Sequence, residues 1–281
     1  AAGRPTGVLH GLQSSFNAFV GHPTWRNKLA NLDHDTLLAR LAEPATKAQL
    51  LSEQSVIKGG LMQDLPSLMG QVFPLGENPN YEPLPEESIA GIAKANGRDV
   101  MDVMYDMLVA NGGKELFYQP LGGYQGFSLD YQKKLLEHPN VLFGLSDGGA
   151  HCGVIADAGM PTFIMTHWGR DRTRGDKMPL EFIVKSLTSS TAHAFGMFDR
   201  GQLTEGMIAD ANIIDFDRLR LHRPEAVFDL PAGGRRLVQR AEGYEITIKS
   251  GEIIFNNGQH SGALPGKLVR RSDAEGVSTA A

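Results

Sequence analysis

Cysteine and long apolar runs are nearly absent from this sequence. Its 281 residues include one cysteine, Cys152, and no stretch of 18 consecutive apolar residues. One cysteine cannot form an internal disulfide, and a chain without such a stretch is not expected to span a bilayer. The opening residues, AAGRPTGVLHG, also lack the basic segment and apolar core of a secretion signal. We therefore expect a protein of the reducing cytoplasm.

An excess of positive charge is lacking as well. The chain has 27 lysines and arginines against 32 acidic residues, a formal net charge of −5. Nucleic acids and anionic membranes attract basic surfaces, so we expect neither as a partner. With 41% hydrophobic and 21% charged residues, the composition is typical of a globular protein with a substantial core.

The usual signatures of metal and cofactor sites are missing too. None of the nine histidines belongs to an H-x-H or H-E-x-x-H pair, and the sequence has no C-x-x-C and no Walker loop. Two adjacent glycines, Gly148 and Gly149, are not by themselves a dinucleotide-binding fingerprint. The sequence as given therefore contains no complete catalytic motif.

Local patterns predict a chain of mixed helices and strands. Apolar periodicity and capping residues predict helices over residues 34–54 with an interruption at Pro44, 85–97, 99–113, 128–139 and 179–197. Strands are predicted over residues 7–12, 115–121 and 140–147. A strand, a helix and a strand in succession over 115–147 predict a parallel pair joined by a right-handed crossover.

The sequence changes character near residue 200. Beyond it, segments such as 209–217 and 245–259 alternate polar and apolar residues between turn formers, which predicts a small antiparallel sheet. A complete eight-stranded α/β barrel needs about 250 residues, and few barrel strands precede residue 150. We therefore predict the last part of a (β/α)8 barrel over 1–199, with an inserted loop near 59–85. The small antiparallel sheet over 200–271, which the resemblance described below implies to be part of a β-sandwich, and a disordered tail over 272–281 complete the prediction.

One acid stands where parallel α/β folds collect their chemistry. Asp147 ends the apolar run VLFGLSD, and Gly148 and Gly149 keep the space beside it free of side chains. An aspartate at the end of such a strand can accept a proton from a metal-bound water or complete a metal shell. Alternatively, Asp147 caps the turn that follows.

Three further side chains deserve consideration as site residues. His151 could contact substrate or simply be hydrogen-bonded in its loop. Cys152 beside it suggests a Cys/His nucleophile, but adjacent residues do not normally face each other. Arg170 lies in the arginine-rich segment THWGRDRTRG, which could bind an acidic substrate group or form a solvated basic loop.

Several segments together resemble a known enzyme family. They are NVLFGLSDGGAH (140–151), LEFIVKSLTSSTAHAFGMFDRGQLTEGMIADANIIDFDRL (180–219) and SGEIIFNNGQHSGALPGKLVRR (250–271). The strongest are DRGQLTEGMIADANIIDFD and the closing pattern G-x-x-x-G-x-x-P-G-K-L-V-R-R. This sequence resembles the C-terminal half of the N-acyl-D-amino-acid deacylases (D-aminoacylases) of the amidohydrolase superfamily over most of residues 100–271.

That resemblance implies a metal-dependent barrel joined to a β-sandwich, and hydrolysis of an amide C–N bond by zinc-activated water. It implies one or two zinc ions and a small-molecule amide substrate. Asp147 corresponds to the family's strand-eight aspartate, which accepts a proton from the water, passes it to the leaving amine and lies near the metal. The resemblance also places the ligand histidines upstream of residue 1, so we expect a fragment that is inactive alone. Because a partial barrel exposes sheet edges and helix faces, we also expect this fragment to aggregate or self-associate.

The match departs from the family in one informative place. The family's substrate-carboxylate arginine has no counterpart in CGVIADAGMPTF (152–163), and the first arginine after Asp147 is Arg170. A cyclic imide or carbamoyl substrate therefore remains an alternative to an N-acyl-D-amino acid. Two other hypotheses are a metal-free hydrolase that uses Cys152 and His151, and a non-catalytic scaffold that completes its fold in an oligomer.

Overall fold

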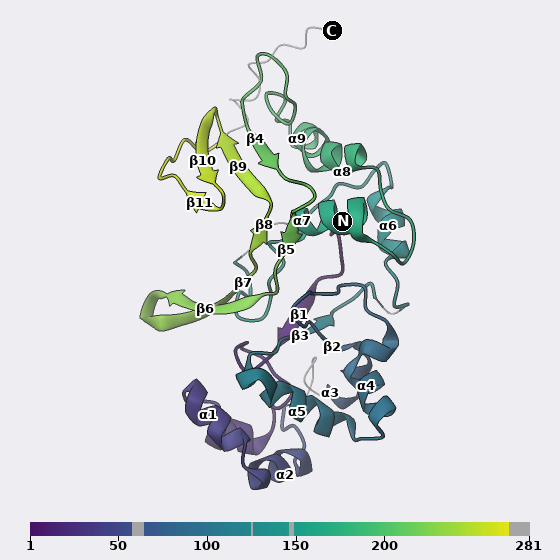
Figure 1. Ribbon diagram of the computed structural model, residues 1–281, viewed down its shortest axis with the longest axis vertical. Coiled ribbons are helices and arrows are strands. Elements are labelled where there is room, and N and C mark those ends of the chain that lie inside the picture. Colours follow the sequence, from purple (N-terminus) through teal and green to yellow (C-terminus); the bar gives the residue numbers. More distant parts are fainter. Residues whose placement is uncertain (58–64, 125, 146–148, 270–281) are drawn as a thin grey trace.

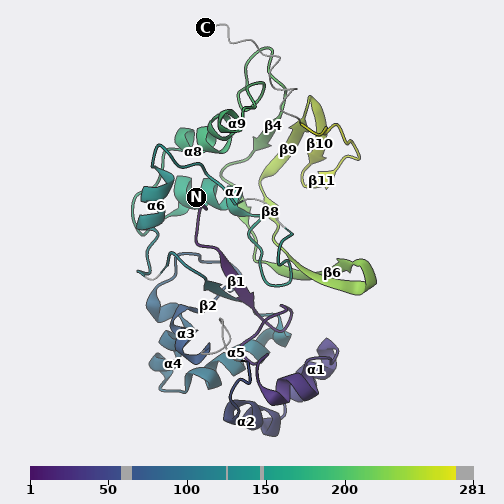
Figure 2. The same ribbon diagram turned by 180° about the vertical axis from the view of Figure 1, so that it is seen from behind.

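The computed structural model describes residues 1–57, 65–124, 126–145 and 149–269 (Figure 1). The helices form two separate groups in space, with a small sheet between the groups and further strands along one side (Figures 1 and 2). The combination of helices and sheets confirms the α/β class. Within the described ranges, no helix combines the length and the apolar composition needed to cross a bilayer.

Local capping signals set the ends of the first group of helices. Asp33 accepts a hydrogen bond from the Thr36 amide at the start of α1, and Pro44 occupies the first turn of α2. Ser88 caps α4, and Gly97 ends it in the left-handed region at φ 61°. These helices are α1 (His34–Leu41), α2 (Pro44–Ser52), α4 (Ile89–Asn96) and α5 (Val100–Gly113). The predicted helices over 34–54 and 85–97 are confirmed. The helix predicted over 99–113 is confirmed as far as Val109, because Ala110, Asn111 and Gly112 leave the helical region.

An apolar cluster holds this helical end together. The α5 residues Met104 and Leu108 are fully buried against Phe19, Leu50 and Met69. Short segments complete this region: η1 (Trp25–Leu29), α3 (Leu65–Leu68), η3 (Met69–Gln71) and η4 (Pro85–Glu87). The methionines therefore fill the core, where their flexible side chains suit irregular gaps.

The central sheet is antiparallel. Its strands are β1 (Gly7–His10), β3 (Phe117–Pro120) and β2 (Phe73–Pro74), in the order β1-β3-β2. Gly7 pairs with Pro120 and His10 with Phe117. Every residue of β3 is buried, and its one amide side chain, Gln119, is paired with His10 on β1. The predicted strands over 7–12 and 115–121 are confirmed.

The predicted parallel pair between residues 115–121 and 140–147 is wrong for the described residues. Helix α6 (Asp130–Leu136) forms as expected, but the segment after it makes only a single parallel bridge, between Gly144 and Ala2. Both edges of β3 are already occupied by β1 and β2, so no edge is left for a third partner. The partial barrel over residues 1–199 remains a prediction.

A second helical group follows residue 159. It comprises α7 (Met160–Phe163), the π-helical segment η5 (Ile164–Asp171), α8 (Leu180–Leu187) and α9 (Ser189–Ala194). The helix predicted over 179–197 is divided in two, because Thr188 leaves the helical region with φ −123° and ψ −93°. Trp168 and Ile183 are fully buried in the cluster that joins these helices to the central sheet.

The predicted antiparallel sheet beyond residue 200 is confirmed. Four strands lie in the order β11-β10-β9-β4: β4 (Ala211–Ile214), β9 (Tyr244–Lys249), β10 (Glu252–Asn256) and β11 (Gln259–His260). Strands β5 (Arg220–Leu221) and β8 (Ala241–Glu242) form a separate pair. The domain division near residue 200 and the β-sandwich stay predictions, and the tail over 272–281 lies outside the described residues.

A β-hairpin projects from the body in both views (Figures 1 and 2). It consists of β6 (Glu225–Leu230) and β7 (Gly234–Val238), joined by the turn η6 (Pro231–Gly233). Glu225 pairs with Val238 and Val227 with Arg236. This hairpin helps to enclose the cavity described below.

Candidate functional site

The residue predicted to be catalytic, Asp147, lies outside the described residues, as do its neighbours 146 and 148. The loop that follows it, from Gly149 to Gly159, is described. We therefore locate the candidate site by the contacts of this loop.

Three backbone hydrogen bonds hold the loop against distant parts of the chain. The Leu9 amide on β1 donates to the Val154 carbonyl at 2.7 Å, and the Ser15 amide donates to the Gly153 carbonyl at 2.8 Å. The Leu237 amide on β7 donates to the Cys152 carbonyl at 2.7 Å. The loop after Asp147 is thus joined to both the segment that follows β1 and the projecting hairpin.

A buried ion pair anchors the far end of the loop. Arg4 Nη1 lies 3.0 Å from Asp157 Oδ1, and both side chains are almost completely buried. The Arg4 guanidinium also lies 3.9 Å from the centre of the Tyr81 ring. Burial raises the pKa of Asp157, and the charge of Arg4 opposes that rise only in part. This pair therefore fixes the loop and is shielded from ligands.

His151 and Cys152 follow Asp147 in the sequence and lie in the described part of the loop. His151 is exposed and has a positive φ of 52°. Its carbonyl accepts hydrogen bonds from the amides of Val154 and Ile155, so its backbone shapes a turn. Cys152 is a free, partly buried thiol. The substrate role predicted for His151 remains untested.

Arg170 makes a different set of contacts. Its Nε and Nη2 donate to the Asp171 carboxylate at 2.6 and 2.9 Å. The same guanidinium donates to the carbonyls of Phe216, Asp217 and Leu219. All five of its N–H groups thus have partners within the protein. Arg170 joins η5 to the segment between β4 and β5, and its predicted substrate role remains untested.

A cavity of about 640 Å³ lies between the Ser15 segment, the start of α1 and the β6–β7 hairpin. Its volume is in the range of small-molecule sites. One part of the lining is apolar: Leu12, Val20, Trp25 and Leu37. Another part is polar: Ser15, Asn17, Asn27, Asn31 and Arg235. Such a lining suits a ligand with one apolar end and one polar end.

Arg235 on β7 also lines the cavity, and no motif in the sequence marks it as a site residue. Its Nη2 donates to Ser15 Oγ at 3.2 Å, while its Nε is buried and has no hydrogen-bond partner among the described residues. Burial lowers the pKa of Arg235. Its neighbour Arg236 instead donates to the Asp229 carboxylate at 2.7 and 2.6 Å. Because successive residues of a strand point to opposite faces, the sequence predicts that Arg235 and Arg236 face different sides of β7. It does not indicate which of them faces the cavity.

Another polar side chain missed by the sequence analysis is His10 on β1. It is fully buried, and its Nε2 lies 2.6 Å from Gln119 Oε1 on β3. Burial lowers the pKa of His10 to about 4, although the contact with Gln119 acts in the opposite direction. His10 is therefore neutral near pH 7 and belongs to the core between the sheet and the Phe16 ring.

The described residues do not provide a metal site. Over 1–57, 65–124, 126–145 and 149–269, no group of three or more His, Cys, Asp or Glu side chains is placed to hold an ion. Three or more such ligands are the ordinary minimum for a bound transition metal. A metal required by this protein must therefore have ligands beyond the described residues.

Two of the comparisons with known proteins give matches. Residues 79–255, more than half of the chain, match the model of the Amidohydrolase family. A structure from a study of the binuclear metal centre in D-aminoacylase is 20% identical, with 82% of this chain and 44% of that chain covered and a TM-score of 0.38. A second D-aminoacylase structure, described as defining a novel subset of amidohydrolases, is 20% identical, with coverages of 84% and 46% and a TM-score of 0.37.

The chain thus spans less than half the length of these solved structures. The comparison with curated proteins gives no match. The family match covers the loop after residue 147, the second helical group and most of the C-terminal sheet. The chain belongs to the amidohydrolase family.

Proposed function

We propose that these residues form part of a metal-dependent amidohydrolase that hydrolyses the amide C–N bond of N-acyl-D-amino acids. Asp147 accepts a proton from the attacking water and passes it to the leaving amine. The products are a carboxylic acid and the free amino acid. The family match supports the reaction class, and the motifs around residues 140–151, 180–219 and 250–271 support the narrower assignment.

One observation supports this location of the site above others. The loop that follows Asp147 is hydrogen-bonded to Ser15, which lines the cavity, and to Leu237 on the strand that carries Arg235. The described part of this loop is thus held to one lining residue of the cavity and to the strand that carries another. Positioning of this kind supplies much of the rate enhancement in enzymes.

The cofactor of this proposal is zinc, as one or two ions. When bound, zinc lowers the pKa of a coordinated water and so supplies a nucleophile near neutral pH. Since the described residues contain no set of three ligands, we assign no metal ligand among them. Asp147, outside those residues, remains the proposed contributor from this sequence.

The test is an assay of the longest reading frame that contains this sequence. Its metal content would be measured by mass spectrometry, and amino acid release would be measured on matched N-acetyl-D- and N-acetyl-L-amino acids. We expect stoichiometric zinc, turnover of the D-series and a loss of about 10²- to 10⁴-fold in kcat for Asp147→Ala. Asp176→Ala is the matched control, because Asp176 is an exposed acid.

Other results would redirect or refute the proposal. Bound zinc without turnover of any N-acetyl amino acid would favour the alternative cyclic imide or carbamoyl substrates. Absence of zinc together with full activity in Asp147→Ala would refute metal-dependent hydrolysis through this aspartate. A protein with neither metal nor activity would favour the non-catalytic scaffold.

A further inference from the structure

We infer that the cavity between the Ser15 segment, α1 and the β6–β7 hairpin binds a monocarboxylate with an apolar tail, and that Arg235 receives its carboxylate. This inference deepens the proposed function and depends on it only for the identity of the natural ligand. The cavity should therefore also bind a simple carboxylate that has no amide bond to hydrolyse.

The first observation is the unusual state of the Arg235 side chain. No acidic residue within the described ranges pairs with it, and its buried Nε–H has no acceptor there. Buried polar groups in proteins almost always have partners, and the Arg235 Nε–H lacks one in the described part of the chain although Nη2 donates to Ser15 Oγ. A bound carboxylate would accept hydrogen bonds from the terminal Nη groups of this guanidinium, since the buried Nε is not accessible to a ligand.

The second observation is that Arg235 is already held in position. The Nη2 donor to Ser15 Oγ lies on the cavity wall, and Ser15 is fixed by the hydrogen bond of its amide to Gly153. The adjacent Leu237 amide binds the same loop. Preorganisation of the guanidinium reduces the entropy that a ligand must overcome on binding.

The third observation is the charge of the lining. Arg26 and Arg235 are its two arginines, and Asp33 is the single acid among the described lining residues. The Asp33 carboxylate already accepts a hydrogen bond from the Thr36 amide, as the cap of α1. The excess of positive charge is local, since the chain as a whole has a net charge of −5. It favours an anionic ligand.

The fourth observation defines the rest of the ligand. Leu12, Trp25 and Leu37 are buried side chains that also line the cavity. Phe228, on the hairpin strand β6, lines it as well and is 60% exposed. An exposed aromatic ring beside an apolar floor gains free energy when an apolar group covers it. A small inorganic anion would leave this surface unused.

The test measures binding of hexanoate, hexan-1-ol and inorganic phosphate to the chain by titration calorimetry. Trp25 lines the cavity and the other tryptophan, Trp168, is fully buried elsewhere, so ligand-dependent fluorescence provides a second measurement. We expect saturable hexanoate binding that is at least about tenfold tighter than binding of either other probe. Trp25→Phe should remove the fluorescence change and retain calorimetric binding.

Two variants on the same strand form the matched comparison. Arg235→Gln should weaken hexanoate binding by about 10- to 100-fold, the usual effect of losing a charge-assisted pair. Arg236→Gln should leave binding unchanged, because the Arg236 guanidinium is paired with Asp229. Thermal melts establish that each variant is folded. If Arg235→Gln does not fold, Arg235→Lys retains the charge without the planar fork and should still weaken binding severalfold.

Three results would overturn the inference: unchanged hexanoate affinity in folded Arg235→Gln, equal affinity for hexanoate and phosphate, or no saturable binding to the folded wild-type chain. The outcome is distinguishable from that of the proposed function. Hexanoate binding without amide hydrolysis in the longer protein refutes only the function. Amide hydrolysis that is unaffected by Arg235→Gln, with no hexanoate binding, refutes only this inference.

Discussion

The Arg172 guanidinium donates two hydrogen bonds to the Glu82 carboxylate, at 3.1 and 2.9 Å, across 90 positions of the sequence. The exposed fractions of the two side chains are 0% and 3%. The Leu129 amide also donates to Glu82 at 2.9 Å. The pair joins the segment before α4 to the end of η5, so it connects two regions that their local sequences do not link.

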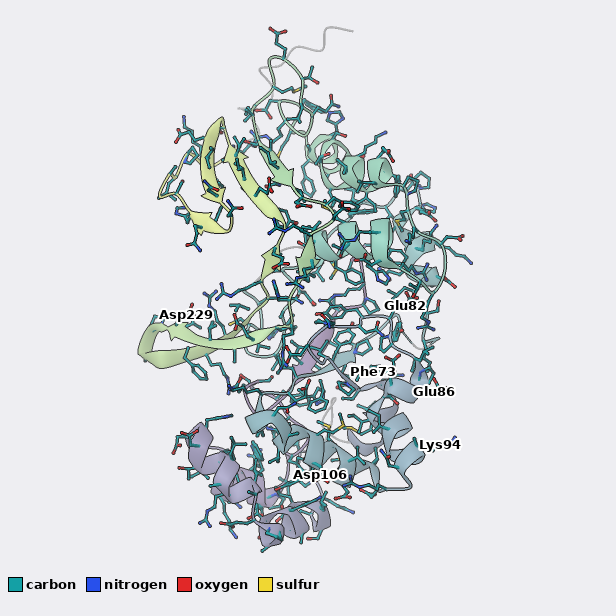
Figure 3. All side chains as sticks on the ribbon, in the orientation of Figure 1. Phe73, Glu82, Glu86, Lys94, Asp106 and Asp229 are labelled. Carbon is teal, nitrogen blue, oxygen red and sulfur yellow. The ribbon has the colours of Figure 1, made fainter. Side chains whose placement is uncertain are left out.

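Replacement of Glu82 should destabilise the fold strongly. Glu82→Gln leaves the buried Arg172 without its main counter-charge, and we expect a loss of about 3 kcal/mol in the free energy of unfolding. Urea denaturation measures this loss. Glu86→Gln is the control, because Glu86 is exposed on the neighbouring turn (Figure 3). Equal stability of Glu82→Gln and the wild type would contradict a structural role for the pair.

The same residue predicts an acid-labile contribution to stability. Burial alone would raise the pKa of Glu82, but His167, Arg172 and the Leu129 amide outweigh it and lower this pKa to about 2. A carboxyl with a depressed pKa in the folded state stabilises the protein above its ordinary pKa of 4.5 and loses that contribution as the pH falls towards 2. Unfolding free energies between pH 5 and pH 2 should fall more steeply in the wild type than in Glu82→Gln.

His10 predicts a second pH dependence, at higher pH. Its folded-state pKa of about 4 lies below the ordinary value of 6.5, so the unfolded chain binds the proton more tightly. The contribution of neutral His10 to the free energy of unfolding is therefore fully present above pH 6.5. It should be lost as the pH falls towards 4, which lowers the free energy of unfolding by about 3 kcal/mol. His10→Gln should flatten this part of the profile, whereas replacement of the exposed His138 by Gln should not. A wild-type profile that is level from pH 7 to pH 4.5 would refute the prediction.

Arg170 can be tested as a structural or a substrate-binding residue. Lysine cannot reproduce hydrogen bonds to three carbonyls and a carboxylate, so Arg170→Lys should lower the unfolding free energy by about 1–3 kcal/mol. Arg218→Lys is the control, since the Arg218 side chain is 69% exposed. An unchanged melt combined with a raised KM in the active protein would instead support the substrate role.

Cys152 separates the metal-dependent hypothesis from the nucleophile hypothesis. Its carbonyl binds β7, and its side chain adjoins His151 in sequence, an arrangement in which the two groups do not normally face each other. Cys152→Ala should therefore change kcat/KM by less than about twofold in the active protein. Loss of turnover in Cys152→Ala with zinc still bound would instead support the Cys/His mechanism.

Much of the secondary structure was predictable because its causes are local. The caps at Asp33 and Ser88, the break at Pro44 and the stop at Gly97 act within one or two helical turns. The apolar residues of β3 likewise indicated a strand. The segment over 140–147 is also rich in apolar residues, but its described part does not form a strand. Strand formation there requires a free edge of a neighbouring strand, and that edge is supplied by residues far away in the sequence.

The sequence by itself determined the family, the helices and the special position of Asp147 after an apolar run. Only the tertiary structure distinguished Arg235 from Arg236, or Arg172 from the other arginines of its segment. Neighbouring arginines have the same chemistry in a sequence. Their roles differ because folding places one guanidinium beside a carboxylate and another in a cavity without one, and this placement depends on contacts between residues distant along the chain.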